Sequence, residues 1–422
     1  VEIGGNWVEG VGGKNINPVL SLVQKRKLNF VPTDFDNCTY RMNNGVTNQD
    51  AFDARSAVFD KVTEALDDMY SKQSGKNVLD ISLRAAYRLL GWHPQDALDN
   101  VLEWNSFDWE QAETPDVSSF RKTSDQATFT NFGEESNMVL DKRGFQYIVE
   151  AEAADFGCGY GSSCLKLGKV VTQIKWASAP VTVTCKDGSV YTADFVVSSV
   201  SLGVLQHGDI KFTPSLPDWK LQAIQSHHIA TYTKIFIAFP SKFWTEESQF
   251  LYYGNERRGE FISWQIMTSA PFNSYFKYDN VLLCTVTDEV ARRLERQSDE
   301  DTKAEMVQVL RKMYGSKVPN ASAILVPRWT SDPLFRGSFT NWPIGFTQEQ
   351  FQNLIAPVNR LWFTGEHTSA EYFGYIHGAI IAGNRTGNDL VKCIKSSCPK
   401  YPYYPTLANN VQDNVKYGQG QK

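Results

Sequence analysis

One set of residues that could do chemistry lies in LWFTGEHTSAEYFGYIHGAIIAG, residues 361–383. A short apolar strand leads into Thr364, Gly365 and Glu366, and a helix is expected to begin near Tyr375. The first turn of a helix leaves backbone N–H groups unpaired and carries partial positive charge. The segment therefore suits an anion or an electron-rich ring carbonyl, and the glutamate suits a sugar-like hydroxyl. A surface strand–turn–helix with an incidental acid has the same spacing, so this alternative stays open.

A second candidate is Lys234, which lies in the apolar strand pattern TYTKIFIAF of residues 231–239. A lysine among such neighbours is costly unless it is paired or hydrated. Tyr232, two residues earlier, is expected to share its side of the strand. The pattern indicates either a chemical role for the lysine or a strand residue that faces outward.

Two acids and a run of glycines complete the set. Glu9 and Glu110 are carboxylates that could attract and orient a ligand with several positive charges. For Glu110, in FDWEQAETP, a solvated helix or loop charge is an equal alternative. The segment VEIGGNWVEGVGG holds Gly4, Gly5 and Trp7 as well as Glu9. Glycines at this density let a backbone pass close to a bulky group or take a positive φ.

The composition is that of an ordinary globular chain. Of 422 residues, 42% are hydrophobic and 21% are charged, which is enough for a large core. The net charge of −5 argues against nucleic acid as the main partner. No apolar run approaches the roughly 18 residues that a membrane-spanning helix needs. We therefore expect neither a nucleic-acid partner nor a membrane span.

The seven cysteines lack the paired spacing of a zinc site, so no bound metal is expected. Cys158 and Cys164 flank a loop-like stretch, and Cys393 and Cys398 lie near the end of the chain. Each pair could form a local disulfide in an oxidising compartment. Free thiols are the alternative for both pairs.

Helical and strand patterns alternate along the chain, which favours an α/β or α+β fold with a mixed sheet. Residues 53–70 predict a helix with Val58, Val62, Leu66 and Met69 on one apolar face. The segment VTVTCKDGSVYTADFVVSS predicts a hairpin that turns at Asp187 and Gly188. TKIFIAF, NVLLCTVT and RLWF predict further strands.

Several segments, taken in order, resemble those of FAD-dependent amine oxidases, especially the plant polyamine oxidases. VEIGGNWVEGV resembles the loop that crosses the flavin ring, and KVVTQIKW the strand beside adenine. SVSLGVL and FTPSLPDWKLQAI resemble the stretches at the start of the substrate domain. TYTKIFIAFP carries the family lysine, PRWTSDPLFRGSFTNWPIG the aromatic wall, and residues 361–383 the C-terminal flavin contact. The resemblance extends over essentially the whole chain.

The resemblance implies an α/β plus α+β fold with two interleaved domains. A Rossmann-like FAD-binding domain, incomplete at its N-terminus, would comprise residues 1–25, 141–210 and 346–396. A mixed-sheet substrate domain would comprise residues 26–140 and 211–345, and residues 397–422 would form a polar tail. The family also implies a monomer whose partners are a polyamine and O2.

The implied reaction is oxidation of spermine or spermidine at a secondary amine C–N bond by hydride transfer to the flavin. Its products would be an aminoaldehyde, a shorter amine and, from O2, H2O2. Another flavin amine oxidase is one alternative, with a monoamine, an amino acid or methylated lysine as substrate. A chain without cofactor that has a binding role is the other.

The resemblance also implies roles for single residues. Lys234 would hold a water at flavin N5, Glu9 would lie beside the flavin, and Tyr375 would contact the reacting carbon. The residues that would bind the substrate are Glu110, Tyr232, Phe339 and Trp7. The residues that would bind FAD are Gly4, Gly5, Trp7, Val171, Trp329, Thr364, Gly365, Glu366, Tyr375 and Ile376. Related plant enzymes have an aromatic residue after the position of Glu110, and this chain has Gln111, which departs from the family's aromatic clamp.

The GxGxxG turn that binds the FAD pyrophosphate in this family is not found in the sequence. GCGYGS, at residues 157–162, lacks the third glycine and has no strand–turn–helix context. We therefore expect the chain to be a piece of a larger enzyme, with a natural short form that holds FAD weakly as the alternative. The sequons at Asn37 and Asn320 are candidate glycosylation sites and favour an extracellular protein over a cytoplasmic one.

Overall fold

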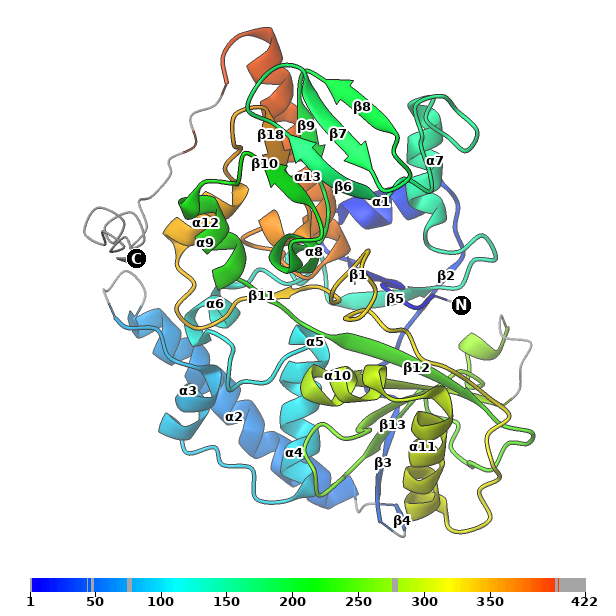
Figure 1. The fold of residues 1–422 in the computed structure, drawn as a ribbon. Coiled ribbons are helices and arrows are strands. Elements are labelled where there is room, and N and C mark those ends of the chain that lie inside the picture. Colours follow the sequence, from blue (N-terminus) through cyan, green and yellow to red (C-terminus); the bar gives the residue numbers. More distant parts are fainter. Residues whose placement is uncertain are drawn as a thin grey trace, which may run out of the picture.

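The computed structural model describes residues 2–43, 45–46, 49–73, 78–274, 280–398 and 401. They form a mixed α/β structure, with a four-stranded sheet in one half of the molecule and a seven-stranded sheet in the other (Figure 1). The predicted fold class is confirmed, while the domain boundaries stay a prediction. Apart from residues 397, 398 and 401, the predicted polar tail lies outside the described residues.

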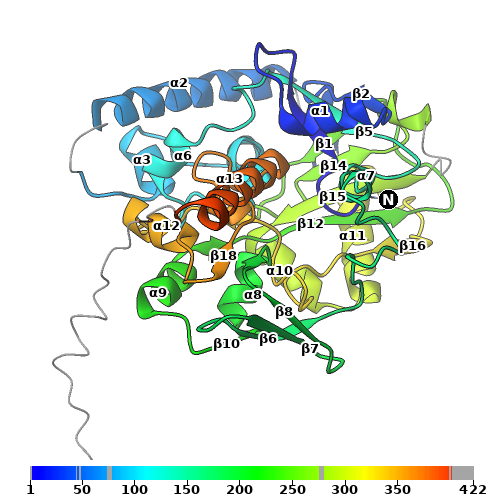
Figure 2. The same cartoon turned by 90° about the horizontal axis from the view of Figure 1, so that it is seen from above.

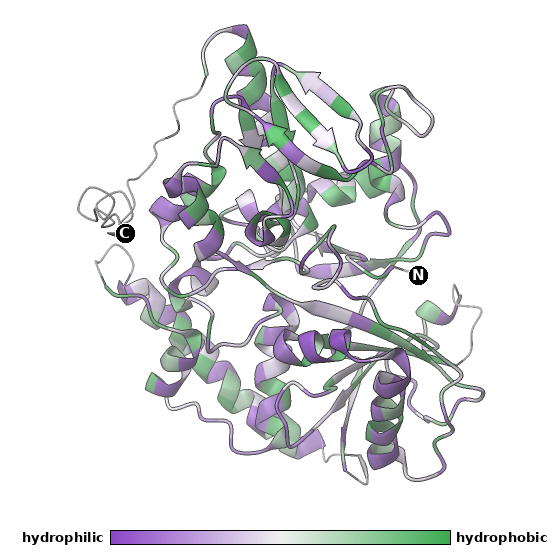
Figure 3. Cartoon of the chain, in the orientation of Figure 1, coloured by the Kyte–Doolittle hydropathy of each residue, from purple (hydrophilic) through white to green (hydrophobic). Residues whose placement is uncertain are grey.

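The seven-stranded sheet has the order β16-β12-β15-β14-β13-β3-β4. Ile235 and Ile237 of β12 pack against α10 and α11 on one face of the sheet. Because successive residues of a strand face opposite sides of the sheet, Lys234 points to the other face. Helix α11 turns hydrophilic residues away from this core (Figure 3). The elements of this half are β3 (Cys38–Met42), β4 (Gly45–Val46), β12 (Tyr232–Ala238), β13 (Phe250–Tyr253), β14 (Ser263–Ile266), η2 (Phe272–Ser274), β15 (Val281–Thr287), α10 (Asp288–Arg296), α11 (Asp299–Tyr314) and β16 (Ala323–Leu325).

The other half contains the sheet β10-β6-β7-β8 and the parallel pair β18-β9. The predicted hairpin is confirmed, since β7 and β8 pair with Val181 opposite Ala193. The strands are β6 (Val171–Lys175), β7 (Val181–Cys185), β8 (Val190–Ala193), β9 (Val196–Ser198), β10 (Lys211–Thr213), β11 (His228–Ile229), β17 (Thr340–Asn341) and β18 (Leu361–Phe363). The helices are α7 (Tyr147–Asp155), α8 (Leu202–His207), α9 (Asp218–Ser226), α12 (Gln348–Ile355), η3 (Glu366–Thr368) and α13 (Ile376–Lys395).

A three-stranded sheet of order β1-β5-β2 lies between the two halves. It consists of β1 (Trp7–Val11), β2 (Phe30–Pro32) and β5 (Glu135–Val139), and it packs with α1 (Pro18–Lys25). Val8 is fully buried in this packing, so Trp7 and Glu9 face the other way. The register of β1 shifts at Gly10, whose φ is 70°, and a Cβ there would lie 2.4 Å from the carbonyl oxygen of Phe129. Glycine is therefore required at this bulge.

Among the remaining helices, α2 runs along one edge of the molecule, with α3 and α6 beside it (Figure 2). The remaining helices are α2 (Gln49–Gln73), α3 (Leu83–Leu89), α4 (Ala97–Glu103), the π turn η1 (Trp104–Asp108), α5 (Trp109–Gln111) and α6 (Phe120–Asp125). The prediction that Val58 belongs to the buried face of α2 is wrong, because it is 51% exposed. Phe59 is buried instead, in a stripe with Phe52, Val62 and Leu66.

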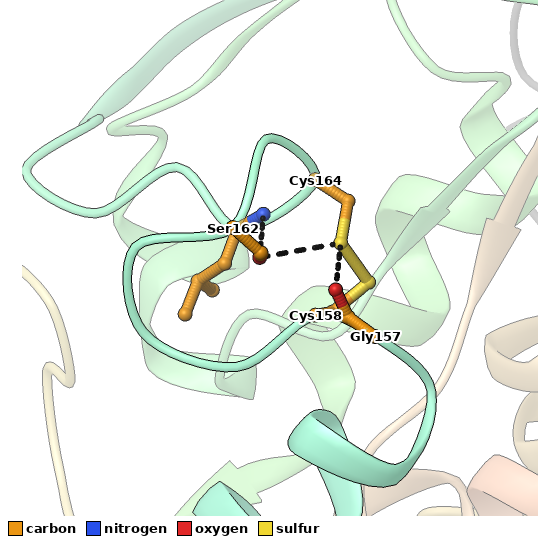
Figure 4. Close-up of a disulfide and its surroundings, with 5 residues drawn as sticks. Gly157, Cys158, Ser162 and Cys164 are labelled. Carbon is orange, nitrogen blue, oxygen red and sulfur yellow. Dashed lines mark hydrogen bonds between the residues drawn. A yellow bond between two sulfur atoms is a disulfide. The ribbon is translucent and has the colours of Figure 1, made fainter.

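Both close cysteine pairs form disulfides, Cys158 with Cys164 and Cys393 with Cys398, which resolves the alternative left by the sequence. The first closes a loop that follows α7 (Figure 4). Inside this loop, Ser162 Oγ lies 3.5 Å from Cys164 Sγ and 3.4 Å from the backbone nitrogen of Leu165. The loop is therefore organised by a covalent bond together with local hydrogen bonds.

Lys220 on α9 is fully buried and caps the C-terminal end of α12. Its Nζ donates to the carbonyl oxygens of Asn353, Leu354 and Ala356 at 2.9, 2.6 and 2.6 Å. We expect Lys220→Met to lower the free energy of unfolding by about 2–4 kcal/mol, because buried carbonyl groups lose their donor. Urea denaturation followed by circular dichroism measures this. Lys175→Met, at an exposed position of β6, is the control and should change the value by less than about 0.5 kcal/mol; an equal midpoint for both variants would refute the capping role.

Candidate active site

A cavity of about 430 Å³ lies between β1 of the three-stranded sheet and β12 of the seven-stranded sheet, a size usual for small-molecule sites. Its walls come from the N-terminal loop and β1, α5, β12, the segment from Trp329 to Phe339, and the start of α13. The predicted site residues on its walls are Gly4, Gly5, Trp7, Glu9, Glu110, Tyr232, Lys234, Trp329, Phe339, Glu366, Tyr375 and Ile376. Val171, at the start of β6, and Thr364 and Gly365, after β18, are not on these walls.

Lys234 is 4% exposed and reaches the cavity from β12. Its Nζ donates to the carbonyl oxygen of Gly4 at 2.7 Å and to Oδ1 of Asn6. It also lies 4.5 Å from the centre of the Trp7 ring. Burial lowers the pKa of Lys234 to about 7, and the negative charge of Glu9 opposes this shift. The lysine is therefore a polar group that two hydrogen bonds hold in a mostly apolar wall, and its charge changes near neutral pH.

Glu9 and Glu110 face the same cavity from β1 and α5. Removal from water raises the pKa of Glu110 to about 7. It also raises the pKa of Glu9 well above its usual value, with a further contribution from Glu110 and an opposing one from Lys234. The hydroxyl of Tyr375 donates to Oε1 of Glu110. The pKa of Glu9 therefore depends on the charges of both Glu110 and Lys234, so the three groups are electrostatically coupled.

Aromatic rings line much of the remaining wall, and one of them, Trp109, was missed by the sequence analysis. The ring centre of Trp109 lies 6.5 Å from that of Trp7 and 6.1 Å from that of Tyr232. Tyr232 in turn lies 5.8 Å from Phe339. The feature of the sequence that could have identified Trp109 is its position directly before the candidate residue Glu110. Other wall residues not predicted include Asn6, Asn17, Phe335, Ser338 and His377.

The start of α13 offers hydrogen-bond donors to the cavity. Tyr375 is the N-cap residue, and its side chain makes no capping hydrogen bond. Ile376 and His377, in the first turn, line the cavity, so the unpaired N–H groups and the partial positive charge of the helix lie at its wall. A Cβ on Gly5 would lie 2.6 Å from Cδ1 of Ile376. The glycine therefore permits the N-terminal loop to pass close to this helix end.

Glu366 offers an acceptor on the same wall. Its Oε2 accepts hydrogen bonds from Oγ1 of Thr340 and from the backbone nitrogen of Gly374, both at 2.7 Å. Within the described residues, no hydrogen bond uses its Oε1. Burial raises the pKa of Glu366, and the bonds from Thr340 and Gly374 oppose this. One oxygen fixes the side chain, and the other remains for a ligand.

Residues 1–391 match the family model described as flavin containing amine oxidoreductase, and the chain belongs to this family. It is similar to polyamine oxidase 1 of Zea mays, with 42% identity over 417 residues that cover 95% of this chain and 82% of the relative. Polyamine oxidase 6 of Oryza sativa subsp. japonica is 41% identical over 415 residues, 95% of this chain and 83% of the relative. A solved double mutant of putrescine oxidase shares the fold, with a TM-score of 0.70 over 92% of this chain and 87% of that chain at 17% identity.

The cavity wall fits a flavin, by the chemistry of its donors and acceptors. Carbonyl oxygens of the ring need N–H donors, which the first turn of α13 provides. Ribityl hydroxyls need an acceptor, and Oε1 of Glu366 is one that no hydrogen bond among the described residues uses. A planar ring needs close approach to backbone, which Gly4 and Gly5 allow.

None of the helices in the described part of the chain combines the length and the apolar character of a membrane-spanning helix.

Proposed function

We propose that the protein is an FAD-dependent polyamine oxidase that oxidises spermine or spermidine at a secondary amine C–N bond. The products are an aminoaldehyde, a shorter amine and, from O2, H2O2. The observation that carries the proposal is the pair of carboxyl groups, Glu9 and Glu110, in an aromatic cavity that also holds Lys234. The similarity to relatives named polyamine oxidases over 95% of this chain supports it.

When bound, the flavin supplies the two-electron oxidation of the C–N bond. The residues of this chain bind and orient the substrate. Glu110 and Glu9 attract its ammonium groups, and Trp109 and Tyr232 offer ring faces to the positive charge. Lys234 holds a proton-donating group at the cavity wall and provides a place for an ordered water. The FAD contacts of Val171, Thr364 and Gly365, which lie outside the cavity wall, stay predictions.

The test uses the protein expressed from its complete reading frame and purified with FAD. Spermine or spermidine should drive O2 consumption with equal release of H2O2. We expect kcat/KM for these amines to exceed that for a monoamine, an amino acid or a methyl-lysine peptide at least tenfold, since those ligands leave one buried carboxylate unpaired. A preference for one of those ligands would establish another flavin amine oxidase. A protein that binds no FAD would favour the cofactor-free alternative.

Because the pKa of Glu110 is raised to about 7, its carboxyl group is mostly neutral below that pH and ionised above it. We therefore expect kcat/KM for spermine to rise as the pH increases through about 7, as more of the free enzyme carries the charge that binds the cation. Glu110→Gln should remove much of this rise and lower kcat/KM about tenfold at pH 8. Because Glu110 is one cause of the raised pKa of Glu9, the remaining dependence should shift to lower pH.

The pH–rate profile of Glu305→Gln, which lies on α11 outside the cavity wall, is the matched control and should follow the parent. An unchanged profile for Glu110→Gln would exclude Glu110 as the group that titrates.

We also propose that the protein acts as a monomer outside the cell. Asn37 and Asn320 are both exposed, and two disulfides suit an oxidising compartment. Light scattering of the purified protein and detection of the glycosylated protein in the medium of secreting cells test the two parts of this proposal. A stable dimer, or retention inside the cell, would contradict them.

A further inference from the structure

The helical stretch that brings Trp109 and Glu110 to the cavity is interrupted by the π turn η1, Trp104–Asp108, between α4 and α5. A π turn contains one residue more than an α-helical turn. Each residue of an α-helix turns the chain by about 100°, so the extra residue rotates all later side chains by that amount. The direction in which Trp109 and Glu110 point therefore depends on the π turn being kept.

Arg258, from the loop between β13 and β14, spans this turn. Its Nη1 and Nη2 donate to the two carboxylate oxygens of Asp108 at 2.6 Å, and its Nε donates to Oε1 of Glu103 at 2.8 Å. Glu103 is the last residue of α4 and Asp108 is the last of η1; both are at most 1% exposed. A planar guanidinium can hold both carboxylates in fixed directions at once. Arg258 thus ties the two ends of the π turn together.

A second set of hydrogen bonds holds the C-terminal end of this helical stretch. Glu113, 2% exposed, accepts hydrogen bonds from Nη2 of Arg292 and from Nε2 of His228. Ala112, with φ of 57°, ends α5, and its carbonyl oxygen accepts from the backbone nitrogen of Asp288 at 3.2 Å. Segment 108–113 is therefore fixed at Asp108 and at Glu113, and the residues between them carry the cavity wall.

We infer that Arg258 and Arg292 are positioning residues that fix the direction of Trp109 and Glu110, and thereby the place where a cation binds. Neither arginine lines the cavity, and each acts through a buried carboxylate next to the wall residues. The part of this inference that concerns a cationic substrate rests on the proposed function. The part that concerns the direction of Trp109 does not.

The variants are Arg258→Lys and Arg292→Lys, because a lysine keeps the charge and cannot make the same forked contacts. Arg293→Lys is the matched control: it lies beside Arg292 on α10 and pairs with Glu305 and Glu260, away from the segment. If Arg258→Lys does not fold, Asp108→Asn replaces it, since the amide removes the charge pair at nearly constant size.

Two readouts separate positioning from stability. For Arg258→Lys and Arg292→Lys we expect KM for spermine to rise about tenfold with kcat within about twofold of the parent, while the control changes neither. Without any substrate, acrylamide should quench the fluorescence of Trp109, obtained by difference from a Trp109→Phe background, about twofold more strongly in both variants. Variants with lower melting temperature but unchanged KM and quenching would overturn the inference. A parent that does not bind spermine would refute the proposed function, and the quenching experiment would still decide the positioning role.

Discussion

Replacing Lys234 by methionine is expected to slow flavin reduction by a polyamine, and flavin reoxidation by O2, by about 100–1,000-fold. The side chain of methionine has a similar length and no polar end, so the wall keeps its shape. What is lost is the Nζ group that Gly4 and Asn6 hold in place. Rapid mixing followed by flavin absorbance, first without O2 and then with it, measures the two steps separately.

The pH dependence of these steps gives an additional check. The pKa of Lys234 is lowered to about 7, so the parent has an ammonium group below that pH and an amine above it. A change in either rate near pH 7 should therefore disappear in Lys234→Met. Lys211→Met, at an exposed position on β10, is the control. Parent-like rates of both steps in a folded Lys234→Met protein would exclude the proposed role.

Replacing Glu103 by alanine is expected to lower the free energy of unfolding by about 3–5 kcal/mol, because Arg84 and Arg258 lose the buried carboxylate that they share. Glu103 is fully buried and accepts hydrogen bonds from Arg84 at 2.6 Å, from Arg258 at 2.8 Å and from Trp92 Nε1 at 3.0 Å. The midpoint of chemical denaturation measures the loss. The more exposed ion pair between Arg293 and Glu305 offers a control, since Glu305→Ala should cost about 1 kcal/mol or less.

Equal losses for the two alanine variants would mean that water or a moved side chain replaces the carboxylate of Glu103. The double variant Glu103→Ala, Arg84→Met tests whether the loss of stability comes from the arginine that Glu103→Ala leaves behind. Removing both members of the pair should restore part of the stability, because no arginine then lacks its bidentate partner at that site.

Local patterns predicted the strands well, because each depends on neighbouring residues. The alternation in TYTKIFIAF placed Lys234 and Tyr232 on one side of β12, and both line the cavity. The hairpin of β7 and β8 followed from its turn residues. On α2 the prediction was right for Val62 and wrong for Val58, since Val58 and Phe59 are adjacent and only packing decided which of them is buried.

The missed features depend on contacts between distant parts of the chain. Trp109 faces the cavity because of a one-residue change in helical register, which no periodicity in the sequence reveals. Arg258 and Asp108 are 150 residues apart in the sequence, and Lys220 is 133 or more residues from the carbonyl groups it caps. The resemblance to a family supplied the candidate residues, while the way they are held became apparent only from the structure.

The hydrogen bond from Tyr375 to Glu110 joins the two walls of the cavity, one at the start of α13 and the other on α5. A cation that binds Glu110 competes with this hydroxyl for the same carboxylate. The tyrosine is the N-cap residue of α13, whose first residues line the cavity. We therefore expect polyamine binding to change the flavin spectrum before any oxidation occurs, because loss of the hydrogen bond between Tyr375 and Glu110 would shift the first residue of this helix.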